Sequence, residues 1–182
     1  MKRIGYLLIF VLGTFSTMNA QQAVSELNVG LLVQKTQHLY WENGIGVDYA
    51  SDVLFNRHIH LKAGYISSRF GSSLVSNAVK QDNLLLGVDF RFRPTKPFQI
   101  FAGVNSGYFF ADYENPAFDV LPNTSLLFSA ETGVVYRFKA PHVSLGLSAG
   151  YNFINGDGIS KPGTLFPVFY KMSLFYNIGT SK

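Results

Sequence analysis

The sequence predicts an all-β protein: an eight-stranded antiparallel up-and-down transmembrane β-barrel, preceded by a cleaved signal peptide. Three observations predict this fold class. Apolar and polar residues alternate in eight separate segments, one face of every segment carries no charge, and the links between segments alternate between short and long. Alternation with a period of two indicates strands, because successive side chains of a strand point to opposite faces.

The clearest alternation lies in the segment 84–110. Every second residue from Leu84 to Phe92 is apolar, and the residues between them include Asp89 and Arg91. A turn with a proline at each end follows at 94–97, and the alternation resumes at Phe98. Two such strands joined by a tight turn predict a β-hairpin.

The same alternation predicts six further strands, which occupy residues 27–33, 41–49, 59–65, 126–138, 143–153 and 168–178. None of the eight outward registers contains Asp, Glu, Lys or Arg. A charge on the lipid face near the bilayer midplane costs about 2–4 kcal/mol, so lipid exposure explains its absence. A soluble barrel of the lipocalin type would need an apolar interior, whereas the inward registers read as polar.

The lengths of the links give the expected orientation. Links 50–57, 94–97 and 139–141 are short, and links 67–83, 111–125 and 154–164 are longer. Outer-membrane barrels place short turns in the periplasm and long loops outside, so both termini are expected in the periplasm. Only the first outer link, 35–40, is shorter than this rule predicts.

The N-terminal segment predicts export. Lys2 and Arg3 are followed by the apolar run 4–12 and a small, polar stretch that ends at Ala20. This is the three-part pattern of a secretory signal peptide, so residues 1–20 are interpreted as the signal peptide and residues 21–182 as one barrel domain. The sequence contains no Cys, which excludes a lipid-modified Cys anchor, disulfides and thiol chemistry.

The charge of the chain argues against a nucleic-acid partner. The formal net charge of +4 falls by two when Lys2 and Arg3 are removed with the signal peptide. The remaining positive charge is spread among few charged residues and forms no basic patch in the sequence. We therefore expect no nucleic-acid binding.

Aromatic residues gather towards both ends of the predicted strands. Such clusters are typical of the two aromatic girdles that anchor a barrel at the membrane interfaces. The expected girdle residues are Trp41, Tyr49, Tyr65, Phe90, Phe92, Phe98, Tyr108, Tyr136, Phe138, Tyr151, Tyr170 and Tyr176.

Charged residues on the inward registers predict a network of ion pairs that fills the lumen. A barrel of eight strands has room for side chains and little else, so inward charges must pair. The expected members are Glu26, Asp48, Lys62, Asp89, Arg91, Arg93, Glu131, Arg137 and Lys171. The hypothesis centres the network on Glu131 with Arg91 or Arg137, and gives it a structural role; narrow conduction is the alternative.

No catalytic residue, metal ligand set or cofactor site is predicted. His58 and His60 fall on one predicted register, but no third ligand accompanies them, so polar packing is preferred to a metal site. The pair His142 and Ser144 resembles the His-x-Ser pair of the outer-membrane lipid A deacylases, which would imply a lipid-modifying enzyme. That pair falls at the predicted periplasmic end on an inward register, so the enzyme is kept as the alternative function.

The whole pattern resembles the small outer-membrane proteins of the OmpA-transmembrane and OmpX-like group. The resemblance rests on the signal peptide, the eight strands and the segments Gly-Val-Asp-Phe-Arg-Phe (87–92) and Ser-Ala-Gly-Tyr-Asn-Phe (148–153). It implies an outer-membrane location, with membrane lipid and the outer-membrane assembly machinery as partners. It also implies a structural or surface-interaction scaffold, whose long links 67–83 and 111–125 are expected to meet an extracellular ligand or surface.

Overall fold

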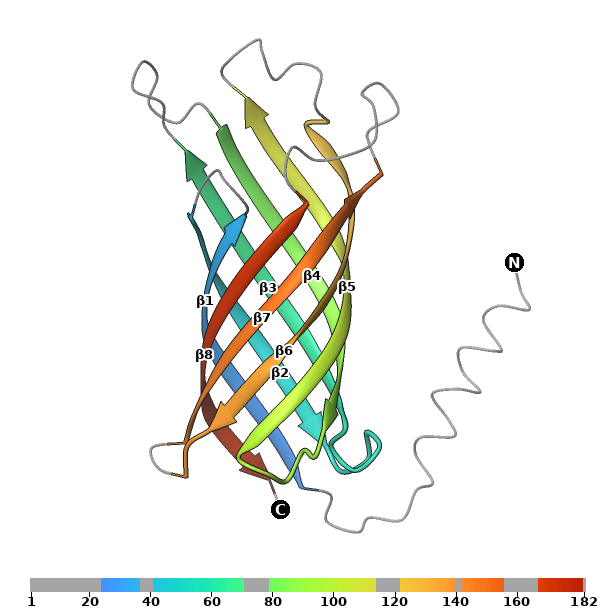
Figure 1. Cartoon of the computed structure of the whole chain (residues 1–182), viewed down its shortest axis with the longest axis vertical. Helices are drawn as coiled ribbons and strands as arrows, with labels where there is room; N and C mark the ends of the chain where they lie inside the picture. The colour runs from blue at the N-terminus through green and yellow to red at the C-terminus, as the bar shows by residue number, and fades with distance from the viewer. Residues whose placement is uncertain are drawn as a thin grey trace, which may run out of the picture.

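The protein is an antiparallel barrel of eight strands in a computed structural model that describes residues 24–36, 41–70, 79–113, 122–139, 142–155 and 167–181. The strands, drawn in Figure 1, are β1 (Ser25–Thr36), β2 (Trp41–Ser51), β3 (Ile59–Phe70), β4 (Val79–Phe92), β5 (Phe98–Tyr113), β6 (Thr124–Arg137), β7 (Val143–Ile154) and β8 (Val168–Ser181). Each strand pairs with its neighbour in the sequence, and β1 pairs with β8, so the sheet closes. The predicted strand count, order and antiparallel pairing are confirmed.

The two ends of the barrel differ in how they connect strands. The turn end carries the connections 52–58, 93–97 and 138–142, and the loop end carries the other connections between strands. Both Val24 and Ser181, the first and last described residues, lie at the turn end, because Ser25 pairs with Ser51 and with Ser181. The predicted signal peptide, residues 1–20, lies outside the described residues and stays a prediction.

The strands are longer at the loop end than the sequence pattern predicts. β3 continues to Phe70, β4 begins at Val79 and β5 ends at Tyr113. The predicted links 67–83 and 111–125 are therefore wrong at both of their ends, and the connections are 71–78 and 114–123. In β4 the reason is that residues 80–83 are polar on both faces, so backbone pairing extends the sheet where no apolar alternation marks it.

These extensions rise above the apolar part of the wall. The 16 residues of β5 span about 53 Å at about 3.3 Å per residue, which a tilt near 40° reduces to about 40 Å of height. The apolar band of such barrels is about 25 Å tall. Charged side chains accordingly appear on the outer face of the extensions, where Lys80 pairs with Asp112 at 3.5 Å.

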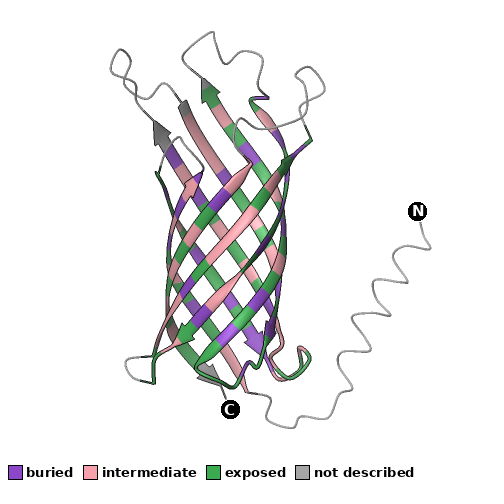
Figure 2. Cartoon of the chain, in the orientation of Figure 1, coloured by how far each residue is buried: buried purple, intermediate pink, exposed green. Residues whose placement is uncertain are grey.

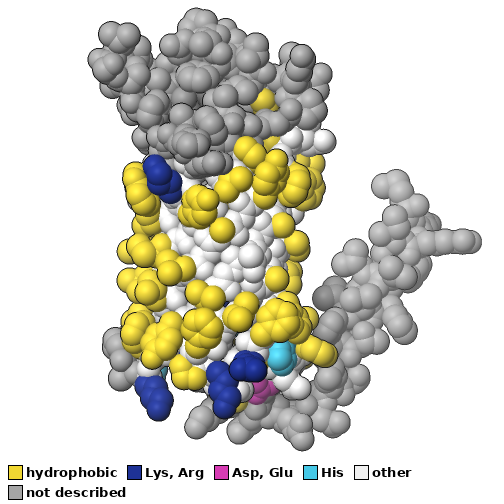
Figure 3. All heavy atoms as spheres, in the orientation of Figure 1, with side chains coloured by type: hydrophobic (Ala, Val, Ile, Leu, Met, Phe, Trp, Pro, Cys, Tyr) yellow, Lys and Arg dark blue, Asp and Glu magenta, His cyan; other side chains and the backbone are white. Residues whose placement is uncertain are grey.

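The outer wall is apolar between the ends, and the inner wall is buried. Leu31, Leu86 and Val104, all midway along their strands, are 61%, 69% and 63% exposed. More buried and more exposed residues alternate along most of the strands (Figure 2), and apolar side chains are spread over the wall that Figure 3 shows, where the charged side chains lie towards its two ends. Among the described residues of the central wall, none that is exposed is charged. The described part of the chain holds no helix that could cross a membrane.

Candidate functional site

The predicted girdle residues all lie on the outer surface. Each of the twelve is at least 37% exposed: Trp41, Tyr49, Tyr65, Phe90, Phe92, Phe98, Tyr108, Tyr136, Phe138, Tyr151, Tyr170 and Tyr176. Several meet an aromatic neighbour on the same face of their own strand. Phe90 contacts Phe92 at 5.1 Å between ring centroids near the turn end, and Tyr108 contacts Phe110 at 5.0 Å towards the loop end. Their role as membrane anchors stays a prediction.

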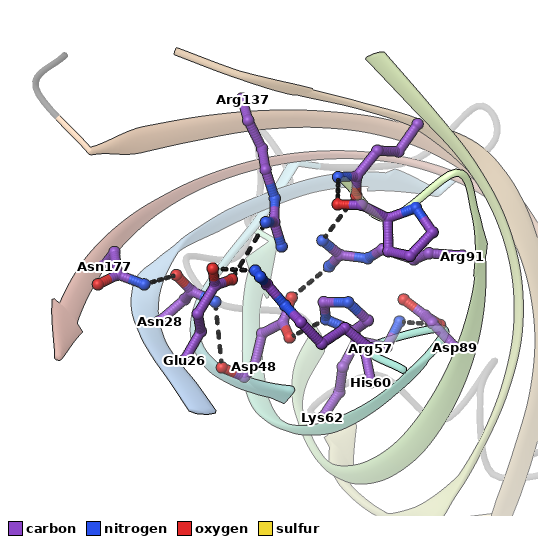
Figure 4. Close-up of polar contacts among 12 residues, drawn as sticks. Glu26, Asn28, Asp48, Arg57, His60, Lys62, Asp89, Arg91, Arg137 and Asn177 are labelled. Atoms are coloured by element: carbon purple, nitrogen blue, oxygen red, sulfur yellow. Dashed lines mark hydrogen bonds and ion pairs between the residues drawn. The ribbon is translucent and has the colours of Figure 1, made fainter. Parts of the chain in front are cut away.

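A layer of ion pairs lies in the lumen near the turn end, as Figure 4 shows. Glu26 of β1 pairs with Arg57 and, at 3.1 Å, with Arg137 of β6. Asp48 of β2 pairs with Arg91 of β4, and Nδ1 of His60 lies 2.7 Å from an oxygen of the same carboxylate. The pairs Glu26–Arg137 and Asp48–Arg91 join strands that are not neighbours in the sheet, so these side chains reach across the interior.

A second layer of ion pairs lies nearer the middle of the barrel. Lys62 of β3 contacts Glu131 of β6 at 2.5 Å and Asp89 of β4 at 2.7 Å. Lys171 of β8 contacts the other oxygen of Glu131 at 2.6 Å. Glu131 also accepts hydrogen bonds from Ser148 at 3.0 Å and from Asn105 at 3.3 Å. Two cations thus face two carboxylates, and this layer is electrically balanced.

Glycine makes this layer possible at one position in particular. A Cβ at residue 103 would collide with the carboxylate of Asp89, and that carboxylate is only 2% exposed. Gly103 lies on the strand next to Asp89, in direct register with it. A side chain at this position would therefore displace Asp89 from Lys62.

Eight of the nine predicted lumen residues lie together in the lumen. The ninth, Arg93, lies outside it, and the predicted ion-pair partners of Glu131 are also wrong. Arg93 lies in the turn after β4 with a φ of 55° and is exposed, because the strand ends at Phe92. The expected centre, Glu131 with Arg91 or Arg137, is also wrong. Glu131 pairs with Lys62 and Lys171, while the two arginines lie lower in the barrel beside Asp48 and Glu26.

Two features of the interior were not predicted. Arg57, expected in a turn, reaches Glu26 in the lumen. Near the loop end, Phe109, Leu127 and Ile154 form a buried apolar cluster with Leu85 and Ala111 against it. The expectation of polar inward registers is therefore wrong for this cluster on β5, β6 and β7, whereas the inward Gln34 and Glu42 at the same end are polar and buried, as expected. Consecutive apolar residues, such as Phe109-Phe110 and Leu126-Leu127-Phe128, were the signal that could have revealed it.

Little space remains inside the ionic part of the lumen. A cavity of about 50 Å³ lies among Lys62, Asp89, Arg91, Phe101 and Lys171, with other lumen side chains. One water needs about 10–15 Å³ of such space, so the cavity has room for roughly four water molecules.

Glu42, nearer the loop end, is buried apart from these cations and accepts hydrogen bonds from Gln34 at 2.5 Å and Thr36 at 3.2 Å.

The geometry supports neither a metal site at His58 and His60 nor a catalytic pair of His142 and Ser144. His58 does not share a face with His60: its ring stacks on the outward Phe90 at 5.3 Å, because residue 58 precedes β3. No group of three or more metal-binding side chains occurs in the described part of the chain. His142 is exposed in a turn with a φ of 65°, while Ser144 faces the lumen. Within residues the structure describes, no hydrogen bond joins this pair.

Comparison with solved structures identifies the fold. The N-terminal β-barrel domain of Pseudomonas aeruginosa OprF matches with a TM-score of 0.58 at 10% identity, over 87% of this chain and 98% of that one. Neisserial surface protein A matches with a TM-score of 0.52 at 16% identity, over 87% and 97%. A de novo designed transmembrane β-barrel matches with a TM-score of 0.53 at 14% identity, over 84% and 95%.

No protein-family model matches the sequence, and no curated protein matches it. The structural likeness establishes the fold. The uncharged, apolar outer wall of this chain is a surface suited to lipid and not to water. The chain therefore has the fold of the small eight-stranded outer-membrane β-barrels, with an outer wall of the composition that lipid requires.

Proposed function

We propose that this barrel is closed to solutes and acts as a membrane scaffold, with neither a pore nor a catalytic centre. The observation that carries the proposal is the set of ion pairs between strands that are not neighbours. Lys62 and Lys171 approach Glu131 from different sides of the interior, and Phe109 and Leu127 pack inside the lumen nearer the loop end. Moving an ion through this layer would require separating pairs that a low-dielectric wall surrounds.

Single-channel recording in planar lipid bilayers tests the closed lumen. The purified, refolded protein is expected to give no stable conductance steps under conditions in which a general porin, recorded in parallel, gives large ones. A gel that compares boiled with unboiled protein verifies that the recorded sample is folded. Stable, large channels from folded protein would contradict the closed lumen.

We further propose that the scaffold presents its loop end to an extracellular ligand or surface. The connections 71–78 and 114–121 fall within the predicted recognition links and lie outside the described residues. They connect β3 to β4 and β5 to β6, strands whose extensions end beyond the apolar wall. Cells that carry a variant with Gly-Ser linkers at both connections should lose surface attachment that the parent protein supports. Attachment equal to that of the parent would contradict this role.

The lipid-modifying enzyme receives no support from the arrangement at the turn end. Glu26, the carboxylate that lines the same 190 Å³ cavity as His142 and Ser144, is already held by Arg57 and Arg137. A nucleophile needs a base within hydrogen-bond reach and a group that orients that base. The His142→Ala and Ser144→Ala variants should leave the mass spectrum of lipid A unchanged relative to the parent strain. A changed acylation pattern would restore the enzyme hypothesis.

A further inference from the structure

Three exposed cations lie at the turn end of the barrel and take part in no ion pair within the described residues: Arg93, Lys96 and Lys139. Arg93 and Lys96 belong to the connection between β4 and β5, and Lys139 belongs to the connection between β6 and β7. Figure 3 shows Lys and Arg side chains gathered at this end, directly below the apolar wall. We call Arg93, Lys96 and Lys139 the basic turn surface.

The basic turn surface lies at the level where lipid phosphates are expected. Arg93 directly follows Phe92, which is 51% exposed, and Lys139 directly follows Phe138, which is 43% exposed. Phe98, two residues after Lys96, is also exposed. Aromatic side chains on the outer face mark the membrane interface, so the next residue towards the turn end reaches the headgroups.

Backbone hydrogen bonds hold the two connections side by side. The amide of Arg137 donates to the carbonyl of Pro97 at 2.8 Å, which links the end of β6 to the turn that carries Lys96. The amide of Phe138 donates to the carbonyl of Val143 at 2.9 Å and closes the second connection. Lys139 is therefore held beside the turn that carries the other two cations.

A buried side chain fixes the shape of the first turn. Gln99, which is fully buried, donates from Nε2 to the carbonyls of Pro94 at 2.6 Å and Lys96 at 3.0 Å. Its Oε1 accepts a hydrogen bond from Arg91 of the lumen network at 3.4 Å. Within the same turn, the amide of Lys96 donates to the carbonyl of Arg93 at 3.0 Å, and the backbone of Arg93 lies in the left-handed region that L residues rarely adopt. A turn ordered before binding loses less entropy when it binds a ligand.

Acidic side chains near the basic turn surface are already occupied. Glu26 is paired with Arg57 and Arg137 inside the lumen. Asp52, on the connection between β2 and β3, is half-buried and accepts a hydrogen bond from the amide of Val24 at 3.0 Å. Asp52 keeps its negative charge and offsets at most one of the three cations, so the basic turn surface retains a net positive charge, which favours an anionic ligand.

We propose that the basic turn surface binds the phosphate headgroups of anionic glycerophospholipids in the membrane leaflet that the turn end faces. The cations, the flanking aromatics and the ordered turn together match a ligand with an apolar tail beside the wall and a phosphate just beyond it. Cationic side chains close to an anionic membrane surface each add to lipid affinity. The site lies at the opposite end of the barrel from the recognition surface proposed above and does not depend on it.

Native mass spectrometry of the folded protein in detergent tests this site. The probes are phosphatidylglycerol and phosphatidylcholine with identical acyl chains. The parent protein should retain phosphatidylglycerol more strongly than phosphatidylcholine. The triple variant Arg93→Gln, Lys96→Gln, Lys139→Gln should lose about tenfold or more in affinity for phosphatidylglycerol, with no change for phosphatidylcholine.

Two controls separate a site from general charge. The variant Lys96→Arg, Lys139→Arg keeps the charges and should retain phosphatidylglycerol as the parent does. Lys80→Gln removes a cation that pairs with Asp112 at the loop end and should also retain it. If the triple variant does not fold, the single variants Lys96→Gln and Lys139→Gln, both at exposed positions, should each show part of the loss. Parental affinity in the folded variants, or an equal loss in Lys80→Gln, would overturn the proposal.

Discussion

The half of the lumen nearer the turn end, called the ionic half, is held mainly by ion pairs. The half nearer the loop end, called the apolar half after its cluster of apolar side chains, also contains the hydrogen-bonded side chains of Gln34, Thr36 and Glu42. In the first, Lys62 and Lys171 meet Glu131, and Arg91 meets Asp48. In the second, Phe109 and Leu127 pack on Ile154 with no charged residue in the cluster. Both halves are enclosed by the same strands, so the contrast arises from the inward side chains alone.

The contrast teaches that the two halves respond differently to a lost side chain. Removing one partner from a buried ion pair leaves the other charge without compensation, which costs more than the pair itself contributes. Removing an apolar side chain costs its contacts and leaves a cavity. In the ionic half, a second substitution that removes the uncompensated charge can therefore restore part of the lost stability. In the apolar half, the lost stability comes from a cavity, so removing a charge cannot restore it.

The largest effect is expected for Glu131→Gln. This change leaves Lys171 without the carboxylate that it contacts at 2.6 Å and leaves Lys62 with Asp89 alone. The free energy of unfolding should fall by about 3–5 kcal/mol. Urea titration in lipid vesicles, followed by the gel shift of the folded barrel, measures the change.

Its matched control is the double variant Glu131→Gln, Lys171→Met. Because the second substitution removes the stranded charge, a substantial part of the lost free energy of unfolding should return. The single variant Lys171→Met completes the comparison. If the loss of unfolding free energy in the double variant equals the sum of the losses in the two single variants, the two residues do not act as a pair, and the description of the ionic half is wrong.

The ionic half also shows how far the sequence carries the prediction. Alternation gave all eight strands and the inward face of Asp48, Asp89 and Glu131, because lipid excludes charge from the other face. Alternation does not predict which of these charged side chains contact one another. Lys62 and Glu131 are 69 residues apart and lie on β3 and β6, so their contact depends on strand tilt and register around the closed barrel.

The apolar half was not predicted for a different reason. Leu127 lies between two outward apolar residues, Leu126 and Phe128, and such a run does not reveal which face each residue occupies. Arg93 fails in the opposite way: it continues the alternation of β4 in the sequence, but the strand ends one residue earlier. Alternation thus predicts well where strands occur. It predicts poorly where they end and which face each residue of a continuous apolar run occupies.

An intermediate effect is expected for Leu127→Ala in the apolar half. Leu127 is 1% exposed, so its truncation should lower the free energy of unfolding by about 3 kcal/mol. The same urea titration measures it. The matched control is Leu126→Ala, at the next residue, where a 50% exposed side chain faces lipid. An equal loss in both variants would mean that Leu127 is not enclosed by the cluster.

The smallest effect is expected for Gln99→Ala, which connects the ionic half to the turn end. Two turn carbonyls lose their donor and Arg91 loses a hydrogen bond, so the free energy of unfolding should fall by about 1–2 kcal/mol. Hydrogen exchange at the amides of Arg93, Thr95 and Lys96 should also become faster. Thr95→Ala, an exposed change in the same turn, serves as the control and should alter neither quantity.

The placement of charge inside and apolar residues outside is tested most directly by spin labels on β5. The chain has no Cys, so single cysteines can be introduced at Val104 and Asn105, neighbours that are 63% and 8% exposed. In lipid vesicles, the label at Val104 should collide freely with oxygen and rarely with a water-soluble nickel complex, and the label at Asn105 should be shielded from both. High oxygen accessibility at Asn105 with a shielded Val104 would contradict the account.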